Sequence, residues 1–239
     1  MIKVENVEIW GFEHAIRGMR NPMNSWDKRD SSVAFHAVEN FAPNDPMQDK
    51  YWEWNDKYNL NIKIGKNDLD LMRRLFKAGT EHRKYLRQIF VSMDITAPLY
   101  WWKEFDTYKV GTVANSCSTM HKIHSKEFEL DDFSHEHLVF DYYFDDEKDT
   151  ATWGETALRK TIYQLNRARD LYLKRKDKKY WWVMIQLLPS SYNQRRTVTM
   201  NYENVMTIIR QRTGHKLDEW NQFVETLKGL PYITEIMES

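Results

Sequence analysis

The sequence predicts a mixed helix-and-sheet protein, on three observations. Residues 2–10 and 91–96 alternate apolar and polar side chains, as half-buried strands do. Amphipathic patterns of helical period follow residues 67, 153 and 201. Of the 239 residues, 41% are hydrophobic, which is enough to bury a sizeable core. We therefore expect an α/β (α+β) fold, with one domain over residues 1–239 because no boundary is visible.

The first part of the chain combines one strand, two irregular stretches and one helix. Residues 2–10 predict a strand with a slip near Asn6. Residues 17–32 are rich in turn formers and predict a loop. Residues 41–61 contain two prolines followed by aromatic residues, which indicates a surface segment that packs against the protein and is not a flexible linker. Asn67 is expected to cap a helix that ends at Gly79.

The stretch Ala97–Met120 (APLYWWKEFDTYKVGTVANSCSTM) follows directly from the strand at 91–96. Pro98 suits the first turn of a helix, where its missing N–H costs nothing. From Gly111 the helical pattern stops, and short hydroxyl, amide and thiol side chains follow. Such side chains bond a ligand or their own backbone, so we expect a polar loop over 112–119.

Most of the second half of the chain is predicted to be helical. Residues 126–150 are acidic and aromatic, and we read them as an insertion into the domain. Residues 153–176 predict a long amphipathic helix, and the apolar run 181–188 fits a strand or a helix. Asn201 is expected to cap another helix, and a last helix is expected to end at Gly229.

Composition narrows the class of partner. The 35 basic and 35 acidic residues balance, so nothing global favours a nucleic-acid polymer or an anionic membrane. A small anionic ligand needs only a few local cations. No run approaches the ~20 apolar residues that cross a bilayer. The one cysteine, Cys117, excludes an intrachain disulfide and favours a reducing, cytoplasmic location.

Neither cysteine nor histidine spacing indicates a catalytic or metal site. The sequence holds no His or Asp against Cys117 that would activate it as a nucleophile. The histidines at 121, 124, 135 and 137 lack the accompanying Cys or carboxylate spacing of a metal site. We therefore predict no metal.

Two blocks of the sequence resemble the flavin-dependent thymidylate synthases. The first is VSMDITAPLYWWKEF followed by DTYKVGTVANSCST. In that family the same run leads into the signature Arg-His-Arg-x-x-Ser, then Glu or Gln, x, Ser, x, Arg. The second is LLPSSYNQRRTVTMNYENVMTIIRQRTGHKLDEW, where the family has Leu-Pro, an Arg, Thr-x-Asn and a helix bearing an Arg. The similarity covers roughly residues 67–120 and 155–230, and neither core block needs an insertion or a deletion.

Most signature side chains of the family differ in this chain. The family Arg-His-Arg is Thr107-Tyr108-Lys109, and the signature positions that follow are Thr112, Asn115, Cys117 and Thr119. A changed signature affects chemistry more than fold, because the two are separable. The fold implied by the resemblance is therefore better supported than the reaction.

The resemblance implies a central mixed sheet flanked by helices, assembled as a homotetramer. In the family, FAD and dUMP bind between subunits. Reduced FAD passes a hydride into a methylene group from a reduced folate, NADPH supplies the electrons, and dTMP is formed without a protein nucleophile. The function that this implies is the reductive methylation of dUMP.

Two arginines are the leading nucleotide-binding candidates. By resemblance, Arg212 polarises the pyrimidine ring and is the catalytic residue, because a guanidinium stabilises negative charge on a ring carbonyl. Arg195 is matched to the residue that binds the nucleotide phosphate, to which its planar fork is suited. From the residues alone, Arg195 could equally be a surface arginine, and Arg212 a partner of Asp218 or Glu219.

The candidate cofactor residues are Tyr108, Lys109, Thr112 and Asn201. Lys109 keeps the charge of the family arginine and loses its fork, so binding would be less directional. Tyr108 could stack on a flat ring or belong to the core. Asn201 could hold the flavin, cap a helix, or do both.

The remaining candidate substrate-binding residues are Glu104, Asn115, Cys117, Ser118 and Thr119. A carboxylate at 104 would repel a nucleotide phosphate, so either Glu104 turns away or the ligand differs.

Two alternatives stay open. The chain could be a binding or assembly protein that kept the fold and lost the reaction, because the lost cations weaken the field that two phosphate-bearing ligands need. It could also act on a modified pyrimidine nucleotide, with the change expressed at Glu104, Asn115 and Cys117.

Overall fold

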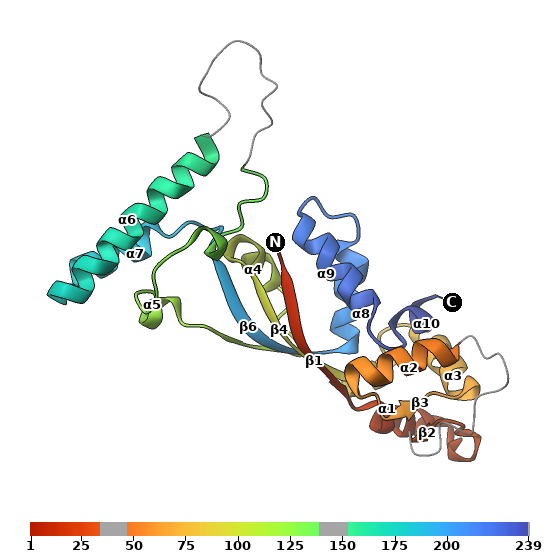
Figure 1. Cartoon of the computed structure of the whole chain (residues 1–239). Helices are drawn as coiled ribbons and strands as arrows, with labels where there is room; N and C mark the ends of the chain where they lie inside the picture. Colours follow the sequence, from red (N-terminus) through yellow and green to blue (C-terminus); the bar gives the residue numbers. More distant parts are fainter. Residues whose placement is uncertain (34–46, 139–152, 239) are drawn as a thin grey trace, which may run out of the picture. The chain divides into compact units, whose positions relative to one another are not determined.

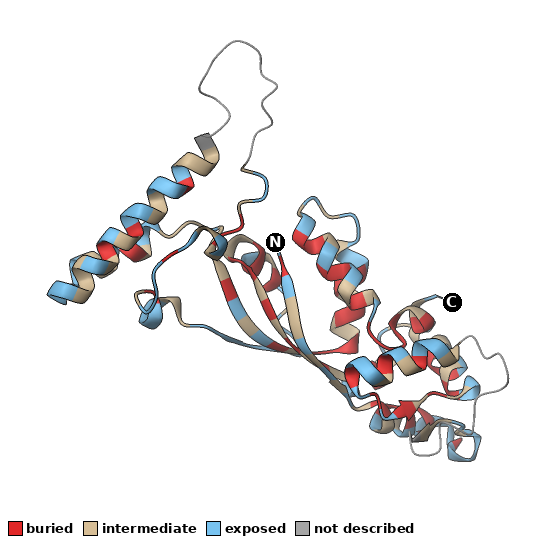
Figure 2. Ribbon diagram, viewed as in Figure 1, coloured by how far each residue is buried: buried red, intermediate tan, exposed pale blue. Residues whose placement is uncertain are grey.

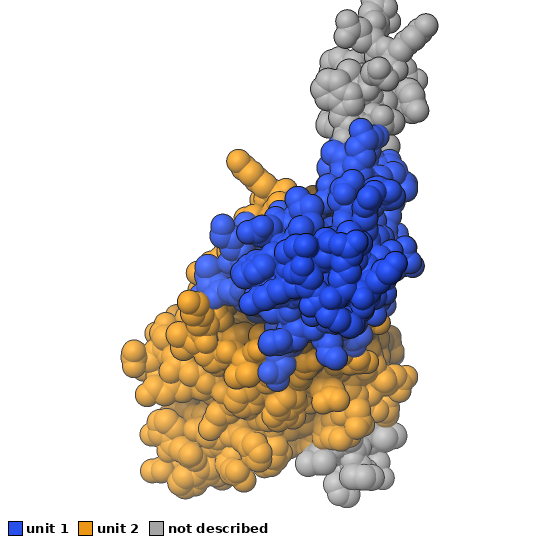
Figure 3. All heavy atoms as spheres, turned by 90° about the vertical axis from the view of Figure 1, so that its left-hand side faces the viewer, with its two compact units in different colours: residues 1–3, 95–107, 115–196 blue, residues 4–94, 108–114, 197–239 orange. Residues whose placement is uncertain are grey.

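The computed structural model describes residues 1–33, 47–138 and 153–238, which form two compact units (Figure 3). The first unit comprises Met1–Lys3, Ile95–Thr107 and Asn115–Arg196. The second comprises Val4–Asp94, Tyr108–Ala114 and Thr197–Ser239. The chain thus passes repeatedly between the two units. A single domain over 1–239 stays a prediction.

A four-stranded antiparallel sheet and many helices make up the fold, which confirms the predicted class (Figure 1). The sheet order is β1-β4-β6-β5, and every one of these strands contributes residues to both units. Its strands are β1 (Lys3–Trp10), β4 (Phe90–Pro98), β5 (Thr112–Ser116) and β6 (Asn193–Asn201). A second, two-stranded sheet pairs β2 (Ser32–Val33) with β3 (Ile62–Lys63).

The two predicted strands are confirmed in detail. Val91, Met93 and Ile95 of β4 are fully buried, as their alternation predicted. The slip expected near Asn6 is a left-handed backbone conformation with φ of 50°. The Asn6 Nδ2 amide donates to Asp94 Oδ2 at 2.8 Å, and asparagine tolerates this φ better than most residues.

Helices supply most of the first unit. They are α4 (Leu99–Phe105), α5 (Thr119–Lys122), the 3-10 turn η5 (Leu130–Asp132), α6 (Trp153–Arg175) and α7 (Lys178–Leu187). Helices α6 and α7 lie side by side (Figure 1). The predicted helix over 153–176 is confirmed, and the run 181–188 proves helical. Asp177 caps α7, because its Oδ1 accepts from the Lys179 N–H at 3.0 Å.

The described part of the expected insertion contributes to the core of the first unit. Phe128 and Phe133 are buried in a cluster with Leu165 of α6 and Met184 of α7. Residues 139–152 lie outside the described residues. Whether 126–150 is an insertion stays a prediction.

The second unit holds most of the remaining helices. They are α1 (Phe12–Arg20), η1 (Asn21–Met23), η2 (Trp26–Lys28), α2 (Met47–Tyr58), α3 (Lys66–Lys77), η4 (Arg83–Gln88), α8 (Tyr202–Arg212), α9 (Asp218–Lys228) and α10 (Ile233–Met237). Figure 2 shows the buried side of α8, formed by Val205, Met206, Ile208 and Ile209 as predicted. Asn201 caps this helix, since its Oδ1 accepts from the Asn204 N–H at 3.0 Å.

Several local predictions are wrong. Residues 17–20 finish helix α1 in place of the predicted loop. Of the packed segment expected at 41–61, residues 41–46 lie outside the described residues, and residues 47–58 form helix α2, in which Tyr51, Trp54 and Tyr58 are buried as its packing predicted. The polar loop expected at 112–119 is the strand β5 followed by the short helix α5. The helix expected to start at Asn67 begins at Lys66, and the Asn67 N–H is satisfied by Asp30 Oδ2 at 2.8 Å.

Among the described residues, none of the helices combines the length and apolar composition needed to cross a lipid bilayer.

Candidate functional site

The Arg212 cluster consists of Tyr108, Arg212, His215 and Trp220, all in the second unit. Arg212 is the last residue of α8, where a cation complements the helix dipole. Its guanidinium carbon lies 4.4 Å from the centre of the buried Trp220 ring and 5.6 Å from that of Tyr108. Its Nε donates to the Tyr108 hydroxyl at 2.9 Å. The charge of this half-buried arginine is thus held in place by two aromatic rings.

Hydrogen bonds fix the two other polar members of the cluster. The Tyr108 hydroxyl donates in turn to Gln211 Oε1 at 3.0 Å, so its ring is half-buried against α8. The Leu217 N–H donates to His215 Nδ1 at 3.1 Å, which fixes the orientation of the ring. His215 Nε2 lies 3.1 Å from Arg212 Nη1. The imidazole is therefore within hydrogen-bonding distance of the guanidinium.

A second group in the same unit joins Thr112 to Asn201 through Asn204. Asn204 Nδ2 donates to Thr112 Oγ1 at 2.9 Å and to the Val110 carbonyl. Gly111 sits between them with φ of +73°, and a Cβ there would lie 2.5 Å from Asn201 Nδ2. Only glycine fits this close approach. The helix-capping role of Asn201 is confirmed, and the cofactor-binding roles of Asn201 and Thr112 stay predictions.

In the first unit, adjacent arginines of β6 have different surroundings. Arg195 is exposed, while its main-chain carbonyl accepts from the Cys117 N–H at 3.0 Å. Arg196 lies 4.2 Å over the ring centre of buried Trp102, and its Nη1 donates to Asp106 Oδ1 at 2.6 Å. Successive side chains of a strand point to opposite faces, so the structure fixes Arg196 and presents Arg195 to solvent.

Most of the remaining predicted substrate residues lie at or just after the C-terminal end of β5. Gln194 Nε2 donates to the Cys117 carbonyl at 2.9 Å, and the Cys117 side chain is exposed. Ser118 Oγ accepts from the His121 N–H at 3.1 Å and so caps α5, which Thr119 begins. Asn115 is exposed at the end of β5, and Glu104 is half-buried on α4.

The structure therefore brings the predicted residues together in separate groups. Tyr108 meets Arg212, Thr112 is linked to Asn201 through Asn204, and Cys117 pairs with the backbone of Arg195. Lys109 is exposed beside the first group. That Arg195 and Arg212 converge on one nucleotide stays a prediction.

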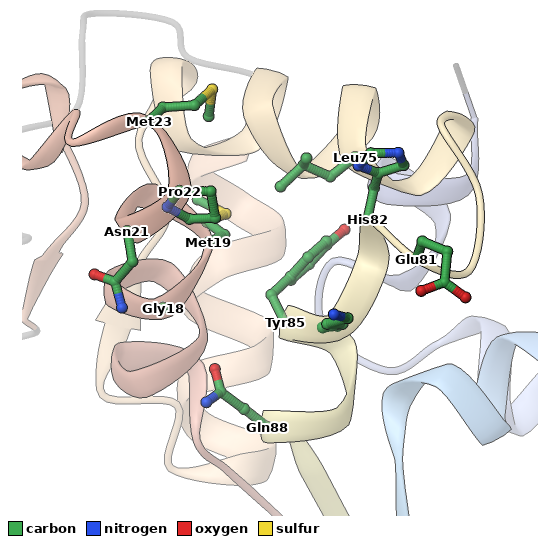
Figure 4. Close-up of a pocket in the computed structure, with 11 residues that line it drawn as sticks. Gly18, Met19, Asn21, Pro22, Met23, Leu75, Glu81, His82, Tyr85 and Gln88 are labelled. Atoms are coloured by element: carbon green, nitrogen blue, oxygen red, sulfur yellow. The ribbon is translucent and has the colours of Figure 1, made fainter.

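A cavity of about 430 Å³ in the second unit was missed by the sequence analysis (Figure 4). Buried Met19 and Tyr85 contribute to it, and polar side chains of His82, Lys84 and Gln88 line it. Burial raises the pKa of Tyr85 far above its ordinary range, and its hydroxyl donates to the Met72 carbonyl at 2.8 Å. Tyr85 is therefore a neutral, fixed part of the wall.

Glu203 ties this cavity to helix α8. It accepts from Arg83 Nε at 3.1 Å and from Arg87, both in η4. Burial raises the pKa of the Glu203 carboxyl, the Arg87 and Arg83 guanidiniums lower it, and the net pKa lies below its ordinary value. The ion pairs link η4, which lines the cavity, to the helix that carries Arg212.

The described residues were also searched for clusters of side chains that bind metals. In the part of the chain that the structure describes, no group of three or more His, Cys, Asp or Glu side chains could hold a metal ion.

The sequence analysis did not identify His215 and Trp220 as site residues, because their role depends on the turn after α8. The only signal was their place in the second family-like block.

Comparison with known proteins identifies the fold. No protein-family model matches the chain, and no curated protein sequence matches it. Thymidylate synthase X (ThyX) of Helicobacter pylori, solved with FAD and dUMP, has a TM-score of 0.60 at 14% identity and covers 98% of this chain and 94% of its own. A second structure of that flavin-dependent enzyme from the same organism, complexed with FAD and dUMP, has a TM-score of 0.59 at 15% identity, with coverages of 98% and 95%.

A third structure widens the chemistry found on this fold. The UMP/dUMP methylase PolB of Streptomyces cacaoi, bound with 5-Br dUMP, has a TM-score of 0.53 at 12% identity and covers 100% of this chain and 94% of its own. At these identities the likeness shows a shared fold, as the sequence resemblance implied.

Proposed function

We propose that this chain binds FAD and a pyrimidine nucleotide such as dUMP, and catalyses reductive methylation of that nucleotide with a reduced folate and NADPH. The observation that carries the proposal is the Arg212 cluster, a half-buried guanidinium held by two aromatic rings and a histidine. The three similar structures were all solved with dUMP or a bromo derivative of it, which supports the choice of ligand.

Arg212 is assigned to the pyrimidine ring. A ring carbonyl gains negative charge as the ring is activated, and a fixed cation beside it stabilises that charge without reorganising. His215 supports the guanidinium, since its Nε2 lies 3.1 Å from Arg212 Nη1. Together they orient the ring and hold its charge.

Arg195 is assigned to the nucleotide phosphate. Its exposed side chain is accessible to a ligand, and a guanidinium fork matches two phosphate oxygens. The short polar side chains of Asn115, Cys117, Ser118 and Thr119 would supply the other contacts of the nucleotide. Glu104 would then turn away from the phosphate, because a carboxylate repels it.

The cofactor is assigned to the second unit. Its cavity falls within the ~300–1,000 Å³ typical of small-molecule sites, and its buried methionine and tyrosine suit a flat ring. Asn201, Thr112, Tyr108 and Lys109 would bind further polar parts of FAD. When reduced, FAD supplies the hydride, and this chain's residues bind and orient it. A homotetramer in the cytoplasm completes the proposal.

A second candidate function is nucleotide or flavin binding without synthesis. It is favoured by Tyr108, which stands where the family has His and is engaged by the Arg212 Nε. It is also favoured by Lys109, whose single ammonium cannot replace an arginine fork. In this case the same residues bind ligand, and turnover is lost or directed to a modified pyrimidine nucleotide.

Two measurements test the proposal. The visible absorption spectrum of freshly purified protein, before and after addition of FAD, reports flavin binding. Thermal unfolding with dUMP reports the nucleotide, since ligand at 100 times Kd stabilises by about 2.7 kcal/mol. A colourless protein that takes up no FAD and gains no stability from dUMP would refute it.

Complementation of a thymidine-requiring bacterium separates the two candidates. Growth without thymidine establishes synthesis. Soluble protein that binds FAD and dUMP but gives no growth establishes the binding function.

A further inference from the structure

Gln194 is a buried amide side chain to which the proposed function assigns no contact. It is the second residue of β6, lies in the first unit and is only 7% exposed. Its main-chain carbonyl accepts from the Trp102 indole Nε1–H at 2.8 Å, which ties the residue to helix α4. Buried polar side chains are normally hydrogen-bonded, so the partners of this amide indicate its role.

Both ends of the Gln194 amide are engaged. Its Oε1 accepts from Arg196 Nε at 3.0 Å, and its Nε2 donates to the Cys117 carbonyl at 2.9 Å. A guanidinium only donates and a carbonyl only accepts, so the two partners fix which way the amide points. The side chain therefore links β6 to the residue that follows β5.

The segment after β5 is held by this link at the point where it turns into a helix. The Cys117 N–H donates to the Arg195 carbonyl at 3.0 Å, which continues the pairing of β5 with β6 by one residue. The carbonyl of the same residue is bound by the Gln194 amide. One residue further on, Ser118 Oγ accepts from the His121 N–H at 3.1 Å and caps α5. Gln194 thus fixes the start of this turn against β6.

We infer that Gln194 is a positioning residue for the nucleotide phosphate, an inference that rests on the proposed function. Two groups of residues are assigned there to the nucleotide: Arg195 on β6, and the segment after β5 that includes Cys117 and Ser118. A ligand that contacts both segments gains most when they are held in place before it arrives. Gln194 is buried, so it acts through these segments and does not touch the ligand.

Hydrogen exchange of the ligand-free full chain, measured by mass spectrometry over residues 113–120, tests the link. Gln194→Met keeps the length of the side chain and removes both amide bonds. A buried hydrogen bond changes a local opening equilibrium by about a factor of ten, so exchange in this segment is expected to rise about tenfold.

Two further variants isolate the bond to Cys117. In Gln194→Glu the carboxylate still accepts from Arg196 and cannot donate to the Cys117 carbonyl, so the same rise in exchange is expected. Arg196→Ala is the matched control, because it removes the bond at the other end of the amide and keeps the one to Cys117. Its exchange over residues 113–120 is expected to equal that of wild type.

Calorimetric titration with dUMP and with deoxyuridine, which lacks the phosphate, tests the consequence for binding. Gln194→Met is expected to weaken dUMP binding about fivefold, as loss of one fixed contact does, and to leave deoxyuridine binding unchanged. A general loss of stability would not distinguish the two ligands.

The outcomes separate this inference from the proposed function. A wild-type protein that binds no dUMP refutes the proposed function, and the role of Gln194 with it. If wild type binds dUMP and Gln194→Met binds it equally tightly, only the inference is overturned. Unchanged exchange in both Gln194 variants overturns it as well.

Discussion

Arg212 and Arg195 are predicted to bind the same nucleotide, yet their surroundings differ sharply. Arg212 in the second unit is half-buried, with its guanidinium held by Tyr108, Trp220 and His215. Arg195 in the first unit is exposed, and its neighbour Arg196 occupies the ordered place over Trp102.

The difference shows two ways of presenting a cation to a ligand. A guanidinium that is fixed before binding loses little freedom when the ligand arrives, so its interactions contribute most of their strength. The interactions of an exposed arginine are screened by water and so contribute less. Arg212 should therefore dominate affinity, with Arg195 as the smaller contributor.

The largest effect is expected at Arg212. Arg212→Ala should leave the fold intact, because the residue is the last of α8, and should abolish nucleotide binding detectable by calorimetry. A loss above about 3 kcal/mol, or more than roughly 100-fold in Kd, follows from removing a half-buried charged partner. Arg210→Ala is the matched control, since Arg210 is exposed on the same helix. Equal affinity in Arg212→Ala would show that the site is elsewhere.

The two adjacent arginines of β6 should separate affinity from stability. Arg195→Ala is expected to weaken dUMP binding by about 1.5–3 kcal/mol, the range for a hydrogen bond to a charged group, with unchanged thermal stability. Arg196→Ala is expected to lower the free energy of unfolding by about 1–2 kcal/mol, because it loses the contact over Trp102. Its dUMP affinity should be unchanged. The reverse outcome would exchange the roles of the two residues.

A smaller effect is expected at Tyr108. Tyr108→Phe keeps the ring beside Arg212 and removes the hydroxyl that accepts from its Nε. The guanidinium then loses one of its fixed contacts, and nucleotide affinity should fall by about 1 kcal/mol, or roughly fivefold. Tyr108→Ala should cost more, because it also removes the ring. If Tyr108→Phe binds as tightly as wild type, the hydroxyl does not position Arg212.

The smallest effect is expected at Glu203, whose ion pairs join η4 to α8. Glu203→Gln should lower the free energy of unfolding by about 1 kcal/mol at pH 7, since the charged pairs with Arg83 and Arg87 are lost. The pKa of the Glu203 carboxyl is lower in the folded state, so its stabilisation is complete above about pH 4.3 and is lost as the pH falls through the folded value. Denaturation curves of both proteins should therefore converge in acid. A difference that persists at low pH would contradict this origin.

The elements that the sequence predicted depend on short-range patterns. The alternation of Val91, Met93 and Ile95 requires only one buried sheet face, and it holds. Asn201 caps α8 through a bond to a residue three positions away, which spacing alone predicts.

The elements that the sequence missed depend on contacts between distant segments. Helix α3 starts at Lys66 and not at Asn67 because Asp30, more than thirty residues earlier, accepts from the N–H groups of its first turn. The polar residues of β5 form a strand because β6 pairs with them, although their propensity favours a loop.

The candidate site also combines residues that short-range patterns predicted and residues that only distant contacts bring together. Arg212 was predicted from its place on a helix, while the histidine and tryptophan that hold it come from the turn and helix that follow. Strand alternation shows that Arg195 and Arg196 face opposite ways and cannot say which side is exposed. The cavity was missed because its lining comes from segments separated by more than fifty residues, including one expected to be a loop.

The most direct test is calorimetric titration of the FAD-supplemented protein with dUMP and with deoxyuridine, which lacks the phosphate. If Arg212 binds the ring and Arg195 the phosphate, Arg212→Ala should lose affinity for both ligands. Arg195→Ala should lose affinity for dUMP alone and bind deoxyuridine as wild type does. Equal binding of dUMP by wild type and Arg212→Ala would contradict the assignment of the site.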